Sequence, residues 1–312
     1  MQLVFFGSFK HYSTMILQSL VASRDLHIVG VVTTPPAPVG PQKILTKTNV
    51  HLFAEKHHLP VSTPEFLTPE VNLPQADFFL VAGYGKLLPA SWLKTPRLGA
   101  INLHFSLLPK FRGANPAEWA ILLGETTTGV TLITMAEEFD TGSIIAQASL
   151  SITPQDTRET LYDKLYTLGA RELPGMLKQY NSLKITPQGT SPTPTAYRFK
   201  RADGYIPWEI ITAAVTGQAY DGSRLPSHLR TAYRYLQLNQ SSDISHQSSF
   251  IARAIRALKG FPGVWTYAPS AKGKKRLKLL SAHLTNSRLI LDQVQLEGLK
   301  ATPFNQIKNQ IL

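Results

Sequence analysis

Apolar runs alternate with amphipathic segments along the first part of the chain. Short, almost continuously apolar runs occur at 2–6, 27–33, 77–83 and 100–106, and helical periodicity follows the first of them through "STMILQSLVAS". Apolar runs separated by helical segments predict a parallel α/β sheet, and strands without a polar face fit a sheet that is covered by helices on both sides. We therefore predict a doubly wound, mostly parallel Rossmann-like domain.

The pattern changes after this region. Residues 128–135 and 144–152 predict two more strands, and 156–180 predicts a long helix that begins near Asp156. The following stretch, 184–197, is rich in Pro, Thr, Gly and Ser, a composition typical of an extended linker. We conclude that the first domain ends close to this stretch.

A second, smaller module follows. Residues 249–267 predict a helix that leads through a turn into an aromatic strand, and "KGKKRLKLLSAHL" and "SRLILDQVQLEG" predict two further strands. The sequence thus predicts a catalytic domain over 1–185, a linker over 186–203 and a small, basic helix-plus-β domain over 204–312.

Charge is distributed unevenly between these parts. The net charge is +12, of which residues 1–199 carry +2 and residues 200–312 carry +10. A strongly basic second part favours a polyanionic partner such as nucleic acid, although a basic surface that only aids solubility explains the same count.

Composition excludes several kinds of chemistry. The chain has no cysteine, so disulfides, thiolate zinc sites and a cysteine nucleophile are excluded. The first turn reads "FFGSFKHY" instead of G-x-G-x-x-G, so a dinucleotide cofactor is not supported. His51, His57 and His58 share a predicted helix without a carboxylate to complete a metal set, and we expect no metal. Without a long apolar run or an export signal, we expect a cytoplasmic monomer that does not enter the membrane.

Polar side chains interrupt the strand at 100–106. Because side chains alternate along a strand, Asn102, His104 and Ser106 share one face, and ligands of parallel sheets bind beyond the carboxyl ends of the strands. A carboxylate from Asp140, in a Gly-containing loop, could orient His104. A hydrogen-bonded core histidine and an Asx-turn aspartate explain the same residues, and sequence spacing leaves both interpretations open.

The segments "INLHFSLLPKFRGANP", "TGVTLITM" and "DTGSI" together resemble the formyltransferase family that uses 10-formyltetrahydrofolate. Asn102, His104 and Asp140 match the Asn–His–Asp triad of that family. The resemblance implies that the triad stabilises the oxyanion of formyl transfer and helps to move a proton. It also implies that two turns contact the folate, through Tyr84, Gly85 and Leu87 and through Ser106, Leu107, Leu108 and Pro109.

Further segments resemble the branch of the family that formylates initiator methionyl-tRNA. They are "VVTTPP", "VAGYGKLLP", "TPRLGAINLH", "TPQDTRETLYDKL" and "IARAIRALKGFPGVW". The resemblance implies tRNA as the partner and an OB-like β-barrel as the second domain. The residues expected to contact tRNA are Lys43, Lys47, Arg112, Lys272, Lys274, Lys275 and Arg276.

The chain departs from this branch in three places. The loop at 34–50 is short and carries few cations, residues 217–248 form an insertion, and the strands near the C-terminus indicate an abbreviated barrel. The insertion is either an additional RNA-facing surface or a surface elaboration. Two alternatives to tRNA formylation remain: formylation of an amino sugar nucleotide or other small amine, and a binding module that has lost turnover.

Overall fold

The computed structural model describes the whole chain except residues 69, 240–243, 271–272 and 312. The chain divides into two compact units, which are described separately. The first contains residues 1–112, 127–150 and 162–192, and the second contains residues 113–126, 151–161 and 193–312. The domain limits expected from the sequence remain a prediction.

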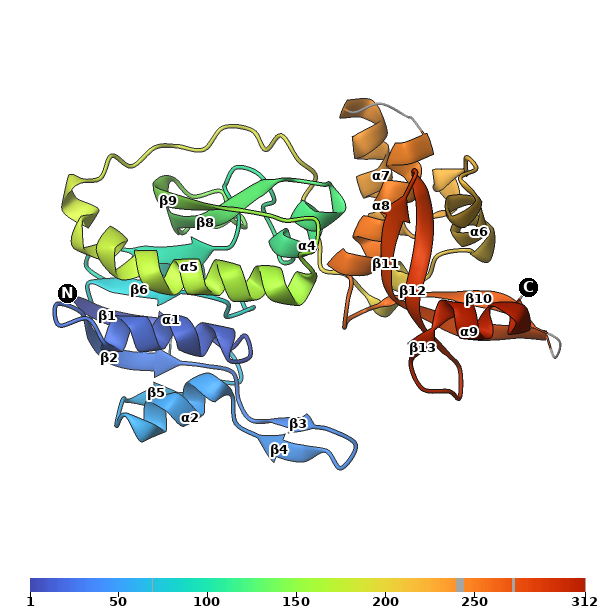
Figure 1. Cartoon of the computed structure of the whole chain (residues 1–312). Coiled ribbons are helices and arrows are strands. Elements are labelled where there is room, and N and C mark those ends of the chain that lie inside the picture. Colours follow the sequence, from blue (N-terminus) through green and yellow to red (C-terminus); the bar gives the residue numbers. More distant parts are fainter. Residues whose placement is uncertain (69, 240–243, 271–272, 312) are drawn as a thin grey trace. The chain divides into compact units, whose positions relative to one another are not determined.

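A seven-stranded sheet forms the centre of the first unit (Figure 1). Five neighbouring strands pair in parallel, and β8 then pairs antiparallel with β7, placing Thr131 opposite His104. In sheet order the strands are β5 (Val61–Ser62), β2 (His27–Val32), β1 (Gln2–Phe6), β6 (Phe78–Val81), β7 (Ala100–His104), β8 (Thr127–Thr134) and β9 (Ile144–Ser151). The mostly parallel sheet predicted from the apolar runs is confirmed.

Both faces of this sheet are covered, as continuously apolar strands require. On one face, Tyr12 of α1 stacks on Tyr166 of α5, and Tyr166 stacks in turn on Phe105 just after β7. On the other face, Phe6 and Phe79 pack with Trp92 of α3. The helices are α1 (Tyr12–Val21), α2 (Asn49–Lys56), α3 (Ala90–Leu93) and α5 (Arg158–Lys178), followed by the 3-10 helix η1 (Tyr180–Ser182).

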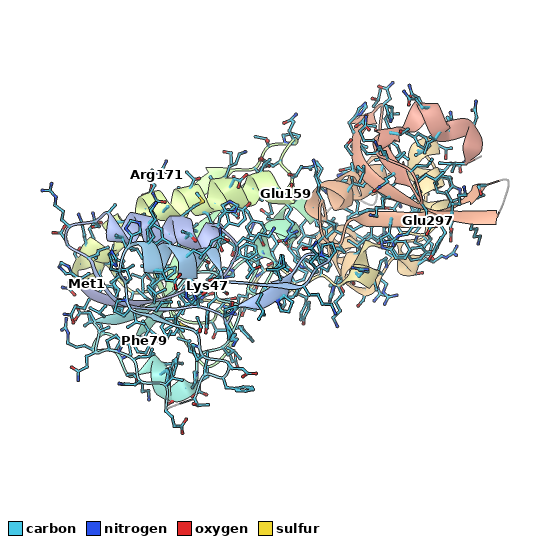
Figure 2. The ribbon with its side chains drawn as sticks, turned by 90° about the horizontal axis from the view of Figure 1, so that it is seen from below. Met1, Lys47, Phe79, Glu159, Arg171 and Glu297 are labelled. Carbon is cyan, nitrogen blue, oxygen red and sulfur yellow. The ribbon has the colours of Figure 1, made fainter. Side chains whose placement is uncertain are left out.

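The short loop expected at 34–50 contains a β-hairpin. Its strands β3 (Ala37–Val39) and β4 (Ile44–Thr46) pair antiparallel, and every residue of both strands is exposed. Lys43 turns the hairpin with a φ of 51°, and Lys47, labelled in Figure 2, follows its second strand.

An antiparallel sheet in the order β10-β11-β12-β13 forms the second unit together with helices. The helix α8 packs against β11 and β12, and α6 packs against β12. The strands are β10 (Val264–Ser270), β11 (Gly273–Thr285), β12 (Arg288–Leu296) and β13 (Thr302–Pro303). The helices are α4 (Pro116–Leu122), α6 (Trp208–Thr216), α7 (Ser227–Asn239), α8 (Ile244–Ala257) and α9 (Phe304–Ile307), with the 3-10 helices η2 (Arg201–Gly204), η3 (Gly222–Arg224) and η4 (Lys308–Gln310). The expected small β domain is confirmed.

Two arginines of α8 explain why early segments of the chain belong to the second unit. Arg253 donates to the Leu122 carbonyl at the end of α4 (3.1 Å) and to Ser249 (2.9 Å), and Arg256 donates to the Asp156 carbonyl. Burial lowers the pKa of Arg253 to about 10. Hydrogen bonds to a helix C-terminus and to a loop carbonyl thus tie 113–126 and 151–161 to α8.

The insertion at 217–248 contributes the helix α7 to the second unit. Tyr233 of α7 is buried and packs edge to face against Phe250 of α8, and Tyr220 donates to the Gln247 carbonyl. Burial raises the pKa of Tyr220 well above its ordinary value. One face of the insertion is therefore part of the core of this unit. Among the described residues, none of the helices combines the length and the apolar character that crossing a membrane requires.

Candidate active site

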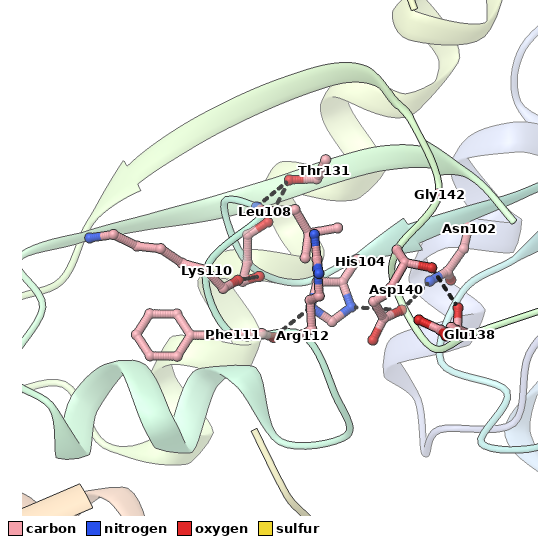
Figure 3. Close-up of polar contacts among 12 residues, drawn as sticks. Asn102, His104, Leu108, Lys110, Phe111, Arg112, Thr131, Glu138, Asp140 and Gly142 are labelled. Atoms are coloured by element: carbon pink, nitrogen blue, oxygen red, sulfur yellow. Dashed lines mark hydrogen bonds and ion pairs between the residues drawn. The ribbon is translucent and has the colours of Figure 1, made fainter. Parts of the chain in front are cut away.

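Three polar side chains meet beside the end of β7. Asn102 and His104 lie on the same face of this strand, and the side chain of Asp140 reaches both from the loop between β8 and β9 (Figure 3). The Asn102 amide Nδ2 donates to Asp140 Oδ1 at 3.2 Å, and His104 Nδ1 lies 3.5 Å from the same oxygen. The structure thus brings together the three residues expected to form the triad.

The Asp140 loop is held in an unusual conformation. Asp140 has a φ of 55°, in the left-handed region that aspartate and asparagine tolerate better than most residues. Two residues later, a Cβ on Gly142 would lie 1.6 Å from the Thr134 carbonyl oxygen, so only glycine permits this close approach. The Thr134 N–H donates to the Ser143 carbonyl and the Ser143 N–H donates to the Thr134 hydroxyl, and these two bonds close the base of the loop. The carboxylate of Asp140 is therefore presented to β7 by a constrained turn.

His104 is buried and contacts an acceptor at each ring nitrogen. Its Nε2 lies 2.9 Å from the Phe111 carbonyl oxygen, and its Nδ1 faces Asp140. Because a carbonyl oxygen only accepts, we assign a proton to Nε2. The other ring nitrogen, Nδ1, faces the Asp140 carboxylate, so a positive charge that develops on the ring during a reaction lies beside a negative one. A histidine held in this way can stabilise negative charge.

The turn at 106–109 is fixed by side chains from neighbouring strands. Thr131 donates to the Ser106 carbonyl (2.6 Å) and accepts from the Leu108 amide (3.1 Å), and Ser106 donates to the Lys110 carbonyl (2.7 Å). Gln147 of β9 donates to the Leu108 carbonyl at 2.9 Å. The Leu108–Pro109 peptide is cis. Leu108 itself is buried, whereas Leu107 and Pro109 are partly exposed.

The other turn expected to contact folate, which contains Tyr84, Gly85 and Leu87, combines a buried ring with exposed residues. The Tyr84 ring is 2% exposed and packs edge to face against Phe6 in the sheet core, and burial raises the pKa of Tyr84 to about 12. Its hydroxyl has no hydrogen-bond partner within the described part of the chain. Gly85 has a φ of 77°, and Leu87 is 51% exposed. Leu87 and the backbone of this turn are therefore more accessible to a ligand than the Tyr84 ring.

The cations expected to contact tRNA in the first unit differ in their surroundings. Lys43 is exposed at the hairpin turn, whereas Lys47 forms an ion pair of 2.6 Å with Glu55. Arg112 lies beside the triad (Figure 3) and donates twice to the Gln188 side-chain oxygen, at 3.1 and 2.9 Å. Of the three, Lys43 is the most accessible for a phosphate.

The cations of the second unit alternate along β11. Lys274, Arg276 and Lys278 lie opposite Pro269, Tyr267 and Trp265 of β10, respectively, so all six side chains share one face of the sheet. The Arg276 guanidinium lies 4.4 Å from the centre of the Trp265 ring, a cation–π contact. Lys275 lies on the opposite face with buried Ala268, and Lys272 falls outside the described residues. Strand alternation would have identified Lys278, which sequence reasoning missed.

Gln188 was also missed by sequence reasoning. It lies in the Pro-rich stretch after α5 and donates to the carbonyl oxygens of Asp140 (2.9 Å) and Gly142 (2.6 Å). A linker composition carries no signal for such a contact. No group of three His, Asp or Glu side chains among the described residues is arranged to hold a metal ion.

The chain is similar to known formyltransferases. The formyl transferase family model matches residues 1–177. A methionyl-tRNA formyltransferase of Staphylococcus epidermidis is 33% identical over 308 residues, covering 96% of this chain and 93% of that protein. One of Staphylococcus aureus is 38% identical over 216 residues, covering 66% of this chain and 68% of that protein.

A solved N-formyltransferase of Helicobacter canadensis, in complex with folinic acid and dTDP-3-aminofucose, shares the fold. Its TM-score is 0.58 at 18% identity, over 91% of this chain and 88% of that one. The match of the family model over more than half of the chain and the full-length similarity to curated relatives agree on one assignment. The chain therefore belongs to the formyltransferase family, in the group of the methionyl-tRNA formyltransferases.

Proposed function

We propose that this enzyme transfers a formyl group from 10-formyltetrahydrofolate to the amino group of initiator methionyl-tRNA, and that Asn102, His104 and Asp140 form its catalytic site. The observation that carries the proposal is the convergence of Asn102 Nδ2 and His104 Nδ1 on one oxygen of Asp140, at the carboxyl end of a parallel strand. The similarity to methionyl-tRNA formyltransferases supports the choice of acceptor.

The chemistry requires stabilisation of a tetrahedral oxyanion. The amine attacks the formyl carbon, the bond from this carbon to N10 of the folate breaks, and the proton lost by the amine is balanced by one gained at N10. One N–H of the Asn102 amide donates to Asp140, and its second N–H is the group that we assign to the oxyanion, a role worth about 10²–10³ in rate. His104, oriented by Asp140, stabilises the same charge or helps to move the proton.

Folate binding is assigned to the two turns beside this triad. Leu107, Pro109 and Leu87 offer partly exposed apolar surface, and apolar surface with a few polar groups is what a ring system such as the pterin requires. The hydrogen bonds of Thr131 and Gln147 hold the turn at 106–109 in shape before the substrate arrives.

RNA binding is assigned to the face of the β10–β11 hairpin that carries Lys274, Arg276 and Lys278. Three cations alternate with Trp265 and Tyr267 across the paired strands. Cations suit phosphate contacts, and aromatic rings suit stacking with unpaired bases.

The test is a comparison of acceptors with the purified full-length protein and 10-formyltetrahydrofolate. We expect formylation of methionyl-initiator tRNA and no comparable formylation of dTDP-linked amino sugars. Formylation of the sugar alone would reject the tRNA assignment, and no turnover with any amine would favour a binding module. In a separate titration, Lys278→Ala should reduce the dependence of log Kd on log salt by about one for each phosphate that the variant no longer neutralises. An unchanged salt dependence would reject the β10–β11 face as the RNA surface.

A further inference from the structure

Two segments of the first unit, here called arms, hold the triad in place, and the side chain of Gln188 connects them. The first arm runs from His104 Nε2 to the Phe111 carbonyl and on to the neighbouring Arg112. The second arm is the loop that presents Asp140. Gln188 bonds to both arms, because its oxygen accepts from Arg112 and its amide nitrogen donates to the carbonyls of Asp140 and Gly142.

The bonding capacity of the Gln188 amide is used in full. Its nitrogen has two N–H groups, and they reach two carbonyl oxygens at 2.9 and 2.6 Å. Its oxygen accepts from Nε and an Nη of Arg112, at 3.1 and 2.9 Å, and the guanidinium also donates to the Gly189 carbonyl at 2.8 Å. A charged donor on the oxygen polarises the amide and strengthens its N–H groups as donors.

The segment that carries Gln188 is itself anchored next to the loop. Thr186 and Ile144 exchange two backbone hydrogen bonds of 2.8 and 2.9 Å, and Ile144 is the first residue of β9. This short pairing brings Gln188 alongside the residues that precede β9. The backbone therefore places Gln188 next to the loop, and its side chain makes the contact from this fixed position.

We propose that Gln188 is a positioning residue for formyl transfer: it holds the left-handed Asp140 turn against β7, so that the carboxylate stays directed at His104 and Asn102. Residues with a positive φ persist where the surroundings over-determine them, and two of the bonds that fix this turn come from Gln188. The inference rests on the proposed function, because formyl transfer is its readout. Arg112 binds the oxygen of Gln188, and we call this Arg112–Gln188 pair the brace. The pairing gives Arg112 a role other than phosphate binding.

The test uses Gln188→Leu and Gln188→Glu in the full-length protein. Leucine removes all the bonds, whereas glutamate keeps an acceptor for Arg112 and loses both donors to the loop. We expect both to lower kcat by about 10- to 100-fold, since small displacements of a reacting group cost that much, with little change in either KM and a fall of only a few degrees in melting temperature from the lost hydrogen bonds. Gln179→Leu, an exposed glutamine nine positions earlier, is the matched control and should retain wild-type kcat.

The outcomes separate the two proposals. If the wild-type protein does not formylate methionyl-tRNA, the proposed function fails whatever the variants do. If it is active and Gln188→Leu keeps its kcat, or if the loss is entirely in KM, the positioning role is rejected. Arg112→Leu combined with Gln188→Leu should reduce kcat no further than the more severe single variant, because the two act as one unit. Multiplying effects would reject the brace.

Discussion

The Asp140→Asn variant tests the electrostatic part of the proposed site most directly. Asp140 Oδ1 lies 3.5 Å from His104 Nδ1, and only 11% of the Asp140 side chain is exposed. A unit positive charge that develops on His104 in the transition state is attracted at this distance by about 5 kcal/mol, with an effective dielectric constant of about 20. Asparagine keeps the oxygen and the shape but removes the charge, so most of this transition-state stabilisation is lost.

We expect Asp140→Asn to lower kcat by about 10²- to 10³-fold, since each 1.36 kcal/mol lost in the transition state costs a factor of ten. The fold should be unaffected, because asparagine adopts the left-handed backbone at Asp140 as readily as aspartate. The substitution therefore changes the charge without changing the backbone, whereas Asp140→Ala would add backbone strain.

The assay is steady-state formylation of methionyl-tRNA with 10-formyltetrahydrofolate, together with thermal unfolding of both proteins. His104→Ala serves as the companion variant and should also lose orders of magnitude in kcat. If Asp140→Asn retains a near-wild-type kcat while remaining folded, Asp140 does not act on His104 as we propose. A loss of kcat accompanied by a large fall in melting temperature would also contradict the reasoning.

Three further predictions concern stability, each measured by urea denaturation. Gly142→Ala should lower the free energy of unfolding by about 1–3 kcal/mol or more, because the added Cβ would clash with Thr134. Gly175→Ala is the control and should leave this free energy unchanged or raise it, because its Cβ would meet nothing within 4 Å. Equal effects of the two substitutions would contradict this prediction. Burial raises the pKa of Tyr84 to about 12, so between pH 10 and 12 the unfolded chain loses this proton more readily than the folded one, and stability falls by about 2 kcal/mol. Tyr84→Phe should lack this part of the fall, and an identical pH dependence would refute the burial argument. Arg253→Met should cost about 1–3 kcal/mol, because it leaves a helix-terminal carbonyl without its charged donor, and an unchanged midpoint would contradict that.

Local patterns predicted most of the first unit. The apolar runs became β1, β2, β6 and β7 nearly at the expected residues, and the long helical pattern became α5. These assignments succeed because side-chain periodicity depends on a few neighbouring residues. The same alternation of side chains was enough to place Asn102 and His104 on one face of their strand.

Other features depended on how distant segments meet. The hairpin at 37–46 was missed because its exposed strands show no periodic burial. The burial of the Tyr84 ring in the sheet core could not be predicted, because the direction of a side chain in an irregular turn follows from packing. The helix α4 belongs to the second unit, where the Leu122 carbonyl at its end accepts a hydrogen bond from Arg253, 131 residues away in the chain.

The sequence alone determined which elements form, which strand carries the polar pair and which family the central motif resembles, because these depend on local order and residue type. The tertiary structure decided that Asp140 meets His104 and Asn102 on one oxygen, and that Gln188 joins the Asp140 loop to Arg112. Those contacts join residues 36 to 76 positions apart. These contacts depend on the path of the loops and on the backbone conformation. The spacing of residues along the chain predicts neither.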